Sequence, residues 1–147
     1  METVVFTRGR YRITTDKSEL DLAVIHDYLS RESYWASGRT LATVRRAVEH
    51  SLCFGLFADG SQVGFSRLVT DYATFAWLGD VFVLPSHRGL GLGKWMIECV
   101  VAHPAIRDIR LALLATRDAH RLYERYGGFA HLEEPGRWMA RWNRAST

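Results

Sequence analysis

The sequence has little of what several classes of protein require. It contains two cysteines, Cys53 and Cys99, and neither has a Cys or His at metal-ligand spacing, so we expect reduced thiols and no metal site. No apolar run is long enough to span a membrane, and no basic segment precedes an apolar one at the N-terminus, so we expect a cytoplasmic protein. Lys and Arg form no stripe, and the formal net charge of +3 is too small to indicate nucleic-acid binding.

What is present predicts one mixed domain. The 147 residues suit a single domain, 1–147, with a sizeable core, and no linker or repeat divides them. Hydrophobic periodicity predicts the order β-α-α-β-β-β-α-β-α-β-β. Three consecutive strands joined by short turns exclude a purely parallel sheet and favour an α/β (α+β) domain. The predicted strands are 6–14, 52–57, 62–69, 75–84, 109–115, 129–132 and 138–142, and the predicted helices are 20–29, 41–50, 94–101 and 119–126.

Local signals mark several helix ends. Asp16 with Glu19 has the spacing of a capping box ahead of the first helix. Thr40 and Asp118 are predicted N-caps of the second and fourth helices. The pair Gly127-Gly128 is predicted to end the fourth.

The most informative stretch is the glycine-rich loop 88–93, in which three glycines alternate with leucines between a predicted strand and a predicted helix. Unpaired N–H groups and the helix dipole make such a loop a cradle for anions, and glycine lets a phosphate approach closely. The loop is no nucleotide P-loop, because Arg88 stands at the first glycine position and Trp95 at the Ser/Thr position. A dinucleotide fingerprint would require glycine at Met96.

The loop instead matches Arg/Gln-x-x-Gly-x-Gly/Ala, as Arg88-x-x-Gly91-x-Gly93, and resembles the acetyl-CoA pyrophosphate loop of the GCN5-related N-acetyltransferases (GNAT). Residues 80–89 resemble that family's fourth strand, and residues 119–129 resemble its Leu-Tyr-x-x-x-Gly-Phe segment with one extra glycine. The resemblance implies a mixed, mostly antiparallel central sheet, flanked by about four helices, with a splayed fourth strand.

The resemblance also implies the activity and the donor. The expected reaction moves an acetyl group from acetyl-CoA to a primary amine by direct transfer in a ternary complex, without a metal. Backbone amides at Val81, Phe82 and Val83 are expected to hold the pantetheine and the thioester oxygen. An alternative is a non-catalytic acyl-CoA-binding or sensing module on the same fold. The pyrophosphate is expected on the loop, at Arg88, Gly89, Leu90, Gly91, Leu92, Gly93 and Lys94.

Two residues are candidates for proton transfer. The resemblance makes Tyr123 the general acid, since a neutral phenol can protonate the leaving sulfur. The base stays open, because Gly79 stands where some family members carry a glutamate. Asp80 is the remaining candidate, and on a regular strand it would share a face with Leu78 and Phe82. It could bind the substrate ammonium, relay a proton through water, or make a structural hydrogen bond.

The acceptor is the least determined part. The family's acceptor pocket lies between the first helix–helix loop and the later strand ends, and aromatic residues with a carboxylate suit a cationic amine. Trp35 and Trp138 could equally be core or dimer-contact residues, and a homodimer is common in the family. Polyamine, amino acid, aminoglycoside-like drug and protein amine all stay open as acceptors. The candidate acceptor residues are Tyr34, Trp35, Asp71, Tyr72 and Trp138.

Overall fold

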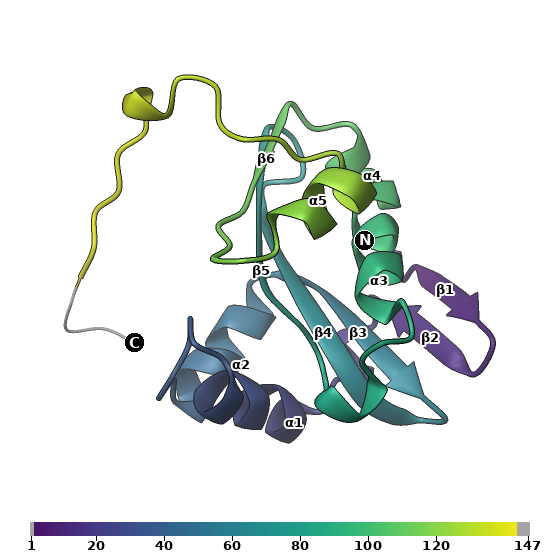
Figure 1. Ribbon diagram of the computed structural model, residues 1–147. Coiled ribbons are helices and arrows are strands. Elements are labelled where there is room, and N and C mark those ends of the chain that lie inside the picture. Colours follow the sequence, from purple (N-terminus) through teal and green to yellow (C-terminus); the bar gives the residue numbers. More distant parts are fainter. Residues whose placement is uncertain (1, 144–147) are drawn as a thin grey trace.

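The computed structural model describes residues 2–143, which form one six-stranded sheet with helices on both faces (Figure 1). The strands lie side by side in chain order, and every neighbouring pair is antiparallel except β5 and β6, which run parallel. This confirms the predicted mixed class with a mostly antiparallel sheet. The strands are β1 (Val5–Arg8), β2 (Tyr11–Thr14), β3 (Leu52–Ala58), β4 (Ser61–Thr70), β5 (Phe75–Val83) and β6 (Leu111–Leu113).

The helices fill the longer connections. Thr40 caps α2 through its hydroxyl, which accepts from the backbone N–H of Thr43, as predicted. Pro104 ends α3 as predicted, and it also opens the short helix α4 that the sequence pattern did not indicate. The helices are α1 (Leu22–Asp27), continued by a π-helical turn (Tyr28–Glu32), α2 (Leu41–Glu49), α3 (Leu92–Ala102), α4 (Pro104–Arg107) and α5 (His120–Gly127).

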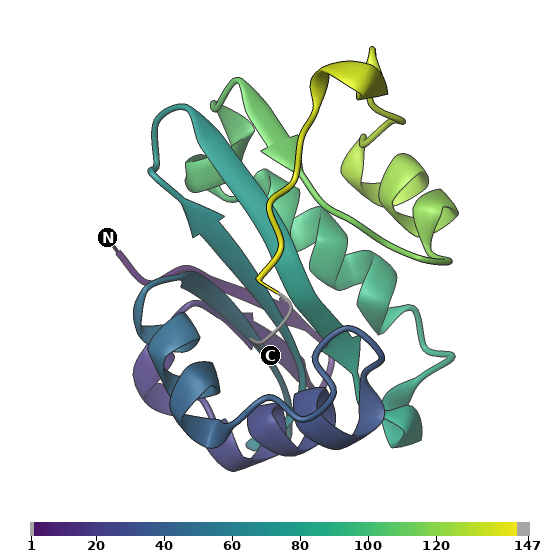
Figure 2. The same ribbon diagram turned by 90° about the vertical axis from the view of Figure 1, so that its left-hand side faces the viewer.

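The sheet separates two hydrophobic cores. Helices α1 and α2 lie on one side of it, and α3 and α5 lie on the other (Figures 1 and 2). The core beneath α3 includes Phe54, Leu68 and Met96, while the core beneath α1 and α2 includes Phe65 and Phe82. Because the strands are covered on both faces, β3 is buried along its whole length and reads as a continuous apolar run.

The N-terminal region differs from the prediction in two ways. The first predicted strand is a hairpin, β1 and β2, because the chain turns at Gly9 with a φ of +60° that glycine adopts freely. The capping box is also wrong in its second half. Asp16 accepts from the N–H of Ser18, but the Glu19 carboxylate pairs with Arg12 across the sheet edge, and Asp21 caps α1.

The chain after α5 was wrongly predicted as two strands. Every residue from 130 to 143 is exposed, and this C-terminal arm loops out from the body of the domain after α5 (Figure 1) before its end returns to it at Trp142. A turn of 3-10 helix at Pro135–Arg137, entered through Glu134 at a φ of +51°, replaces the hairpin. Asp118 does not cap α5, whose N-cap position is Ala119 and has no side-chain cap.

The strand predicted to splay does so, as β5 rather than as a fourth strand, since the N-terminal hairpin adds one. It pairs with β6 only over Phe75–Trp77 and then separates from it. On its other side, β5 pairs with β4 through a bulge that inserts one extra residue into β5. Phe65 pairs with Phe82 and Arg67 with Gly79, so a step of two residues in β4 faces a step of three in β5.

The bulge turns the strand over. Asp80 lies in it at a φ of +54°, which is rare for a residue other than glycine. Leu78 therefore packs in one core and Phe82 in the other, so the prediction that these two share a face with Asp80 is wrong.

Candidate functional site

A cleft of about 670 Å³ opens where β5 separates from β6. One wall is β5 with the loop between α1 and α2, and the other is the segment after β6 with the start of α5. Trp142 of the C-terminal arm also lines it. The cleft brings together most of the predicted site residues: Tyr34, Trp35, Asp80, Val81, Phe82, Val83, Arg88, Gly93 and Tyr123.

The glycine loop forms an open anion cradle beside this cleft. Helix α3 begins after Gly91, which has a φ of +76°, and no side chain of residues 2–143 caps it. The first helical hydrogen bond runs from Trp95 N–H to the Gly91 carbonyl at 3.1 Å, which leaves the preceding N–H groups for a ligand. A Cβ placed on Gly89, Gly91 or Gly93 would meet no atom within 4 Å. The space above the loop therefore fits a diphosphate, as the resemblance implies.

The two cationic side chains of the loop are already engaged. Arg88 Nε donates to the Val83 carbonyl at 3.0 Å, and its NH2 donates to the Tyr28 hydroxyl at 2.8 Å. Lys94 Nζ lies 5.5 Å from the ring centroid of Tyr126. Arg88 thus ties the loop to the end of β5 while keeping its charge near the cradle.

Asp80 is held by three donors. Its Oδ2 accepts from Arg39 NH1 at 2.9 Å and from Arg67 Nε at 2.8 Å. Its Oδ1 accepts from Trp35 Nε1 at 3.0 Å. Both carboxylate oxygens of Asp80 are thus engaged by side-chain donors. Of the three roles left open for Asp80, these contacts match the structural hydrogen bond.

Tyr123 lies on α5 with its ring edge-on to Phe129, their centroids 6.1 Å apart. Burial, together with the neighbouring Tyr34, raises the pKa of Tyr123 to about 12. Its hydroxyl makes no hydrogen bond within residues 2–143. The residue therefore brings a protonated phenol to the cleft at neutral pH.

Tyr34 and Trp35 join the two walls. The Tyr34 hydroxyl accepts from the backbone N–H of Arg117 at 3.0 Å, and the Arg117 guanidinium lies 3.9 Å from the Tyr34 ring centroid. The rings of Tyr34 and Trp35 meet edge-on at 5.1 Å. The α1–α2 loop is thereby fastened to the segment ahead of α5.

Three candidate acceptor residues do not line the cleft. Asp71 accepts from the Thr74 hydroxyl and from the N–H groups of Ala73, Thr74 and Phe75. These bonds hold the β4–β5 turn and keep the pKa of Asp71 well below its usual range. Tyr72 belongs to the same turn, and Trp138 lies beside β6. In their place the cleft contains residues that the sequence did not indicate: Tyr28, Arg39, Arg67, Trp77 and Trp142.

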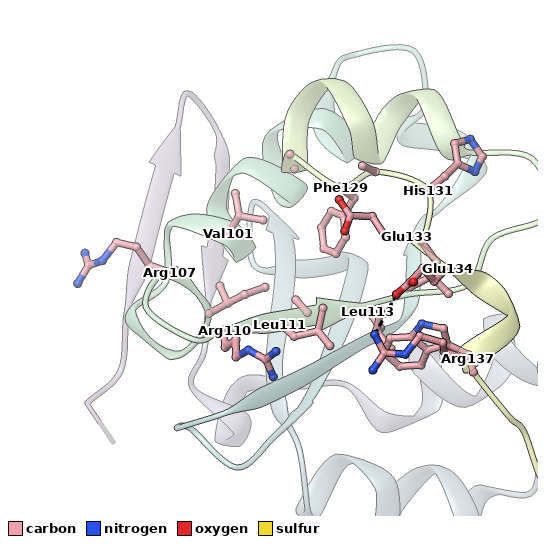
Figure 3. A pocket seen from close by; sticks show the side chains of 17 residues that line it. Val101, Arg107, Arg110, Leu111, Leu113, Phe129, His131, Glu133, Glu134 and Arg137 are labelled. Atoms are coloured by element: carbon pink, nitrogen blue, oxygen red, sulfur yellow. Dashed lines mark hydrogen bonds and ion pairs between the residues drawn. The ribbon is translucent and has the colours of Figure 1, made fainter.

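A second groove, of about 880 Å³, follows the outer edge of β6 (Figure 3). Leu111 and Leu113 of β6 form its floor, and Phe129 and the start of the C-terminal arm form its side.

No described helix is long and apolar enough to cross a membrane. Among residues 2–143 no three His, Cys, Asp or Glu side chains are grouped so that they could hold a metal ion.

Comparison with known proteins points to one family. Residues 49–127, just over half of the chain, match the family model described as "Acetyltransferase (GNAT) domain". A crystal structure of a GNAT-family acetyltransferase from Xanthomonas campestris is 51% identical, with a TM-score of 0.87 over 90% of this chain and 93% of that one. A Gibberella zeae protein named as an acetyltransferase is 34% identical over 78% of this chain and 77% of its own length. Serotonin N-acetyltransferase 2 of Oryza sativa is 31% identical over 63% of this chain, which spans about half of that protein.

Proposed function

This chain belongs to the GNAT family of acetyltransferases, and we propose that it transfers the acetyl group of acetyl-CoA directly to a primary amine in a ternary complex. The observation that carries the proposal is the cleft beside β5, which has the open glycine loop beside it and the half-buried phenol of Tyr123 in its lining. The family takes its acetyl group from acetyl-CoA, whose thioester supplies an activated acyl carbon.

The donor side of the proposal rests on backbone groups. The N–H groups of residues 89–94 would bind the diphosphate, with the positive end of the α3 dipole behind them. Pairing with β6 ends at Trp77, so the β6-facing edge of Val81–Val83 is available to the pantetheine and the thioester oxygen. A backbone donor aimed at an oxygen that gains charge contributes about 3–4 kcal/mol.

Tyr123 is proposed as the general acid. The free thiol has an ordinary pKa of about 8.5. The sulfur becomes basic enough to accept a proton from the phenol only as the C–S bond breaks and negative charge accumulates on it. Because burial raises the pKa of Tyr123 to about 12, the phenol stays protonated throughout the neutral range. During transfer the amine loses one proton to solvent, Tyr123 gives one to the sulfur, and water restores it.

Asp80 is proposed as a positioning residue rather than the base. It fixes the Trp35 indole through Nε1 and holds the bulge at which β5 turns away from β6. No carboxylate is then needed beside the nucleophile if the amine binds in its neutral form.

The test is thiol release from acetyl-CoA in the presence of a panel of amines, with acetyl-CoA binding measured separately by calorimetry. Release that depends on an amine supports the transferase. Acetyl-CoA binding without release for any amine would instead favour the non-catalytic acyl-CoA module.

We also infer a homodimer, assembled through the C-terminal arm. The arm exposes 43% of Trp138 and 97% of Met139, an unusual amount of apolar surface. The outer edge of β6 pairs with no strand of residues 2–143, and the second groove runs along it. A strand formed by residues 138–142 of a second copy would cover both.

Light scattering tests this inference on the full chain, for which we expect twice the 16.8 kDa chain mass. Ala140→Pro removes a backbone donor from the pairing segment and should yield monomers. A chain that is monomeric at high concentration, or a dimer that Ala140→Pro leaves intact, would contradict the arm exchange.

A further inference from the structure

The floor of the cleft carries an unbalanced cluster of charges. Arg39 and Arg67 both pair with the single carboxylate of Asp80, and the three side chains are only 16%, 15% and 4% exposed. Guanidinium groups stay protonated at every physiological pH. The cluster therefore keeps one net positive charge away from bulk water.

The two arginines are not equivalent. Arg67 uses Nε on Asp80 and NH1 on the Ser51 hydroxyl at 3.1 Å. Arg39 uses NH1 on Asp80, and no other acceptor among residues 2–143 meets its guanidinium. Arg39 therefore keeps guanidinium N–H groups beyond the one bound to Asp80, and a ligand that brings an anion to them gains a charge-assisted hydrogen bond.

The charges around the rest of the cleft have the same sign. Among the described lining residues, four arginines (Arg39, Arg67, Arg88 and Arg117) face two carboxylates, those of Asp80 and Asp118. A polyamine or an aminoglycoside would bring further positive charge into this lining and be repelled. The same field favours the neutral form of a bound amine, which is the form that attacks.

Flat aromatic side chains complete the walls. Trp35 and Trp77 are 39% and 38% exposed, and Tyr34 also lines the cleft. The Trp35 indole is fixed in place by its hydrogen bond to Asp80, directly beside Arg39. An anion on Arg39 would thus lie next to a surface suited to an aromatic ring.

We propose that the acceptor is an amino acid with an aromatic side chain, whose carboxylate pairs with Arg39 while its ring packs on Trp35. The proposal rests on the proposed function, since it names the amine that this cleft acetylates. Transfer forms an N–C amide bond on the α-amine, breaks the C–S bond, and releases an N-acetyl amino acid and the free thiol.

Two matched pairs of acceptors test it: tryptophan against tryptamine, and phenylalanine against phenethylamine. Each pair differs only in the carboxylate. A charge-assisted hydrogen bond predicts that kcat/KM for the amino acid exceeds that for the amine by about tenfold to a hundredfold. The readout is thiol release at fixed acetyl-CoA, with spermidine as the polycationic comparison.

Variants tie the preference to Arg39. In Arg39→Gln the ratio of amino acid to amine should fall toward one, and in Arg39→Lys, which keeps the charge but loses the planar fork, it should take an intermediate value. Arg45→Gln, at an exposed position of α2 outside the cleft, removes the same charge and should leave the ratio unchanged. Thermal unfolding of each variant confirms that the ratios come from folded protein.

Equal or better turnover of tryptamine, preference for spermidine, or a ratio unchanged in Arg39→Gln would overturn the proposal while leaving the transferase function standing. No thiol release with the two amino acids, while other amines of the panel support release, would likewise overturn this inference alone. Acetyl-CoA binding without release for any amine of the panel would overturn the proposed function as well.

Discussion

The proposed donor half and acceptor half of the cleft are formed by different kinds of group. The donor half is backbone: three glycines, the first turn of α3 and the free edge of β5. The acceptor half is side chains from segments far apart in sequence, as in the contact of Trp35 with Asp80 and of Tyr34 with Arg117. A backbone cradle depends on the loop conformation and on its glycines rather than on functional side chains, whereas a wall of side chains can change with a single substitution. We therefore expect family membership to define the donor and individual side chains to define the acceptor.

The largest expected effect is at Tyr123, where the donor and acceptor halves of the cleft meet. Tyr123→Phe removes the proton donor and little volume, so kcat should fall by about 10²- to 10⁴-fold. The dissociation constant of acetyl-CoA, measured by calorimetry, should stay within about twofold because the cradle is untouched. Turnover like that of the unaltered protein would remove Tyr123 from the mechanism.

In the acceptor half, the substitution expected to cost the most stability is at Asp80. Asp80→Asn leaves two largely desolvated guanidiniums, 16% and 15% exposed, without a carboxylate and should lower the free energy of unfolding by about 3–5 kcal/mol, as measured in urea. Asp118→Asn, at a side chain that is 69% exposed, should change it by less than about 0.5 kcal/mol. Equal effects of the two substitutions would contradict a structural role for the Asp80 cluster.

The donor half should respond to glycine substitution through binding. Gly91→Ala places a Cβ in the space proposed for the diphosphate, and should weaken acetyl-CoA binding about tenfold. Gly9→Ala is the matched control, since Gly9 also has a positive φ and open surroundings, but lies in the β1–β2 turn. Both variants should lose about 1–2 kcal/mol of stability through backbone strain. Only Gly91→Ala should affect binding, and a similar loss of affinity in Gly9→Ala would refute the cradle.

The smallest expected effect is a pH dependence of stability that arises from His103, at the end of α3. His103 is buried, its Nδ1 accepts from the Ala105 N–H at 3.0 Å, and burial lowers the pKa of its imidazole. The unfolded chain binds a proton below about pH 6.5 that the folded chain resists, so stability should fall as the pH drops below that value. His103→Asn keeps the capping acceptor without a titrating group, and should flatten this part of a plot of unfolding free energy against pH. An unchanged slope would rule out His103 as its source.

The same division explains what could be predicted from the sequence. The glycine loop and α2 were predictable because their signals are local: Gly91 opens a helix and Thr40 caps one within a few residues. The bulge at Asp80 was not, since it exists only in the register between β4 and β5. No local sequence pattern marks Arg39 or Arg67 as a site residue. The role of each depends on its ion pair with Asp80, which the bulge turns toward them.

Asp71 shows the converse. It has the chemistry of an amine-binding residue, but the N–H groups of its own turn occupy it. The strand prediction for the arm failed for a third reason: residues 138–142 are mostly apolar, as strands often are, but no described strand pairs with them. Sequence patterns report what a segment can do, and pairing decides whether it does so.

The most direct test of the whole account is a crystal structure of the full chain with CoA bound. The account predicts the diphosphate on the N–H groups of residues 89–94, the pantetheine along β5 at Val81–Val83, and the sulfur within hydrogen-bond distance of the Tyr123 hydroxyl. Density for CoA in the groove beside β6, or a sulfur remote from Tyr123 with the diphosphate off the loop, would contradict it.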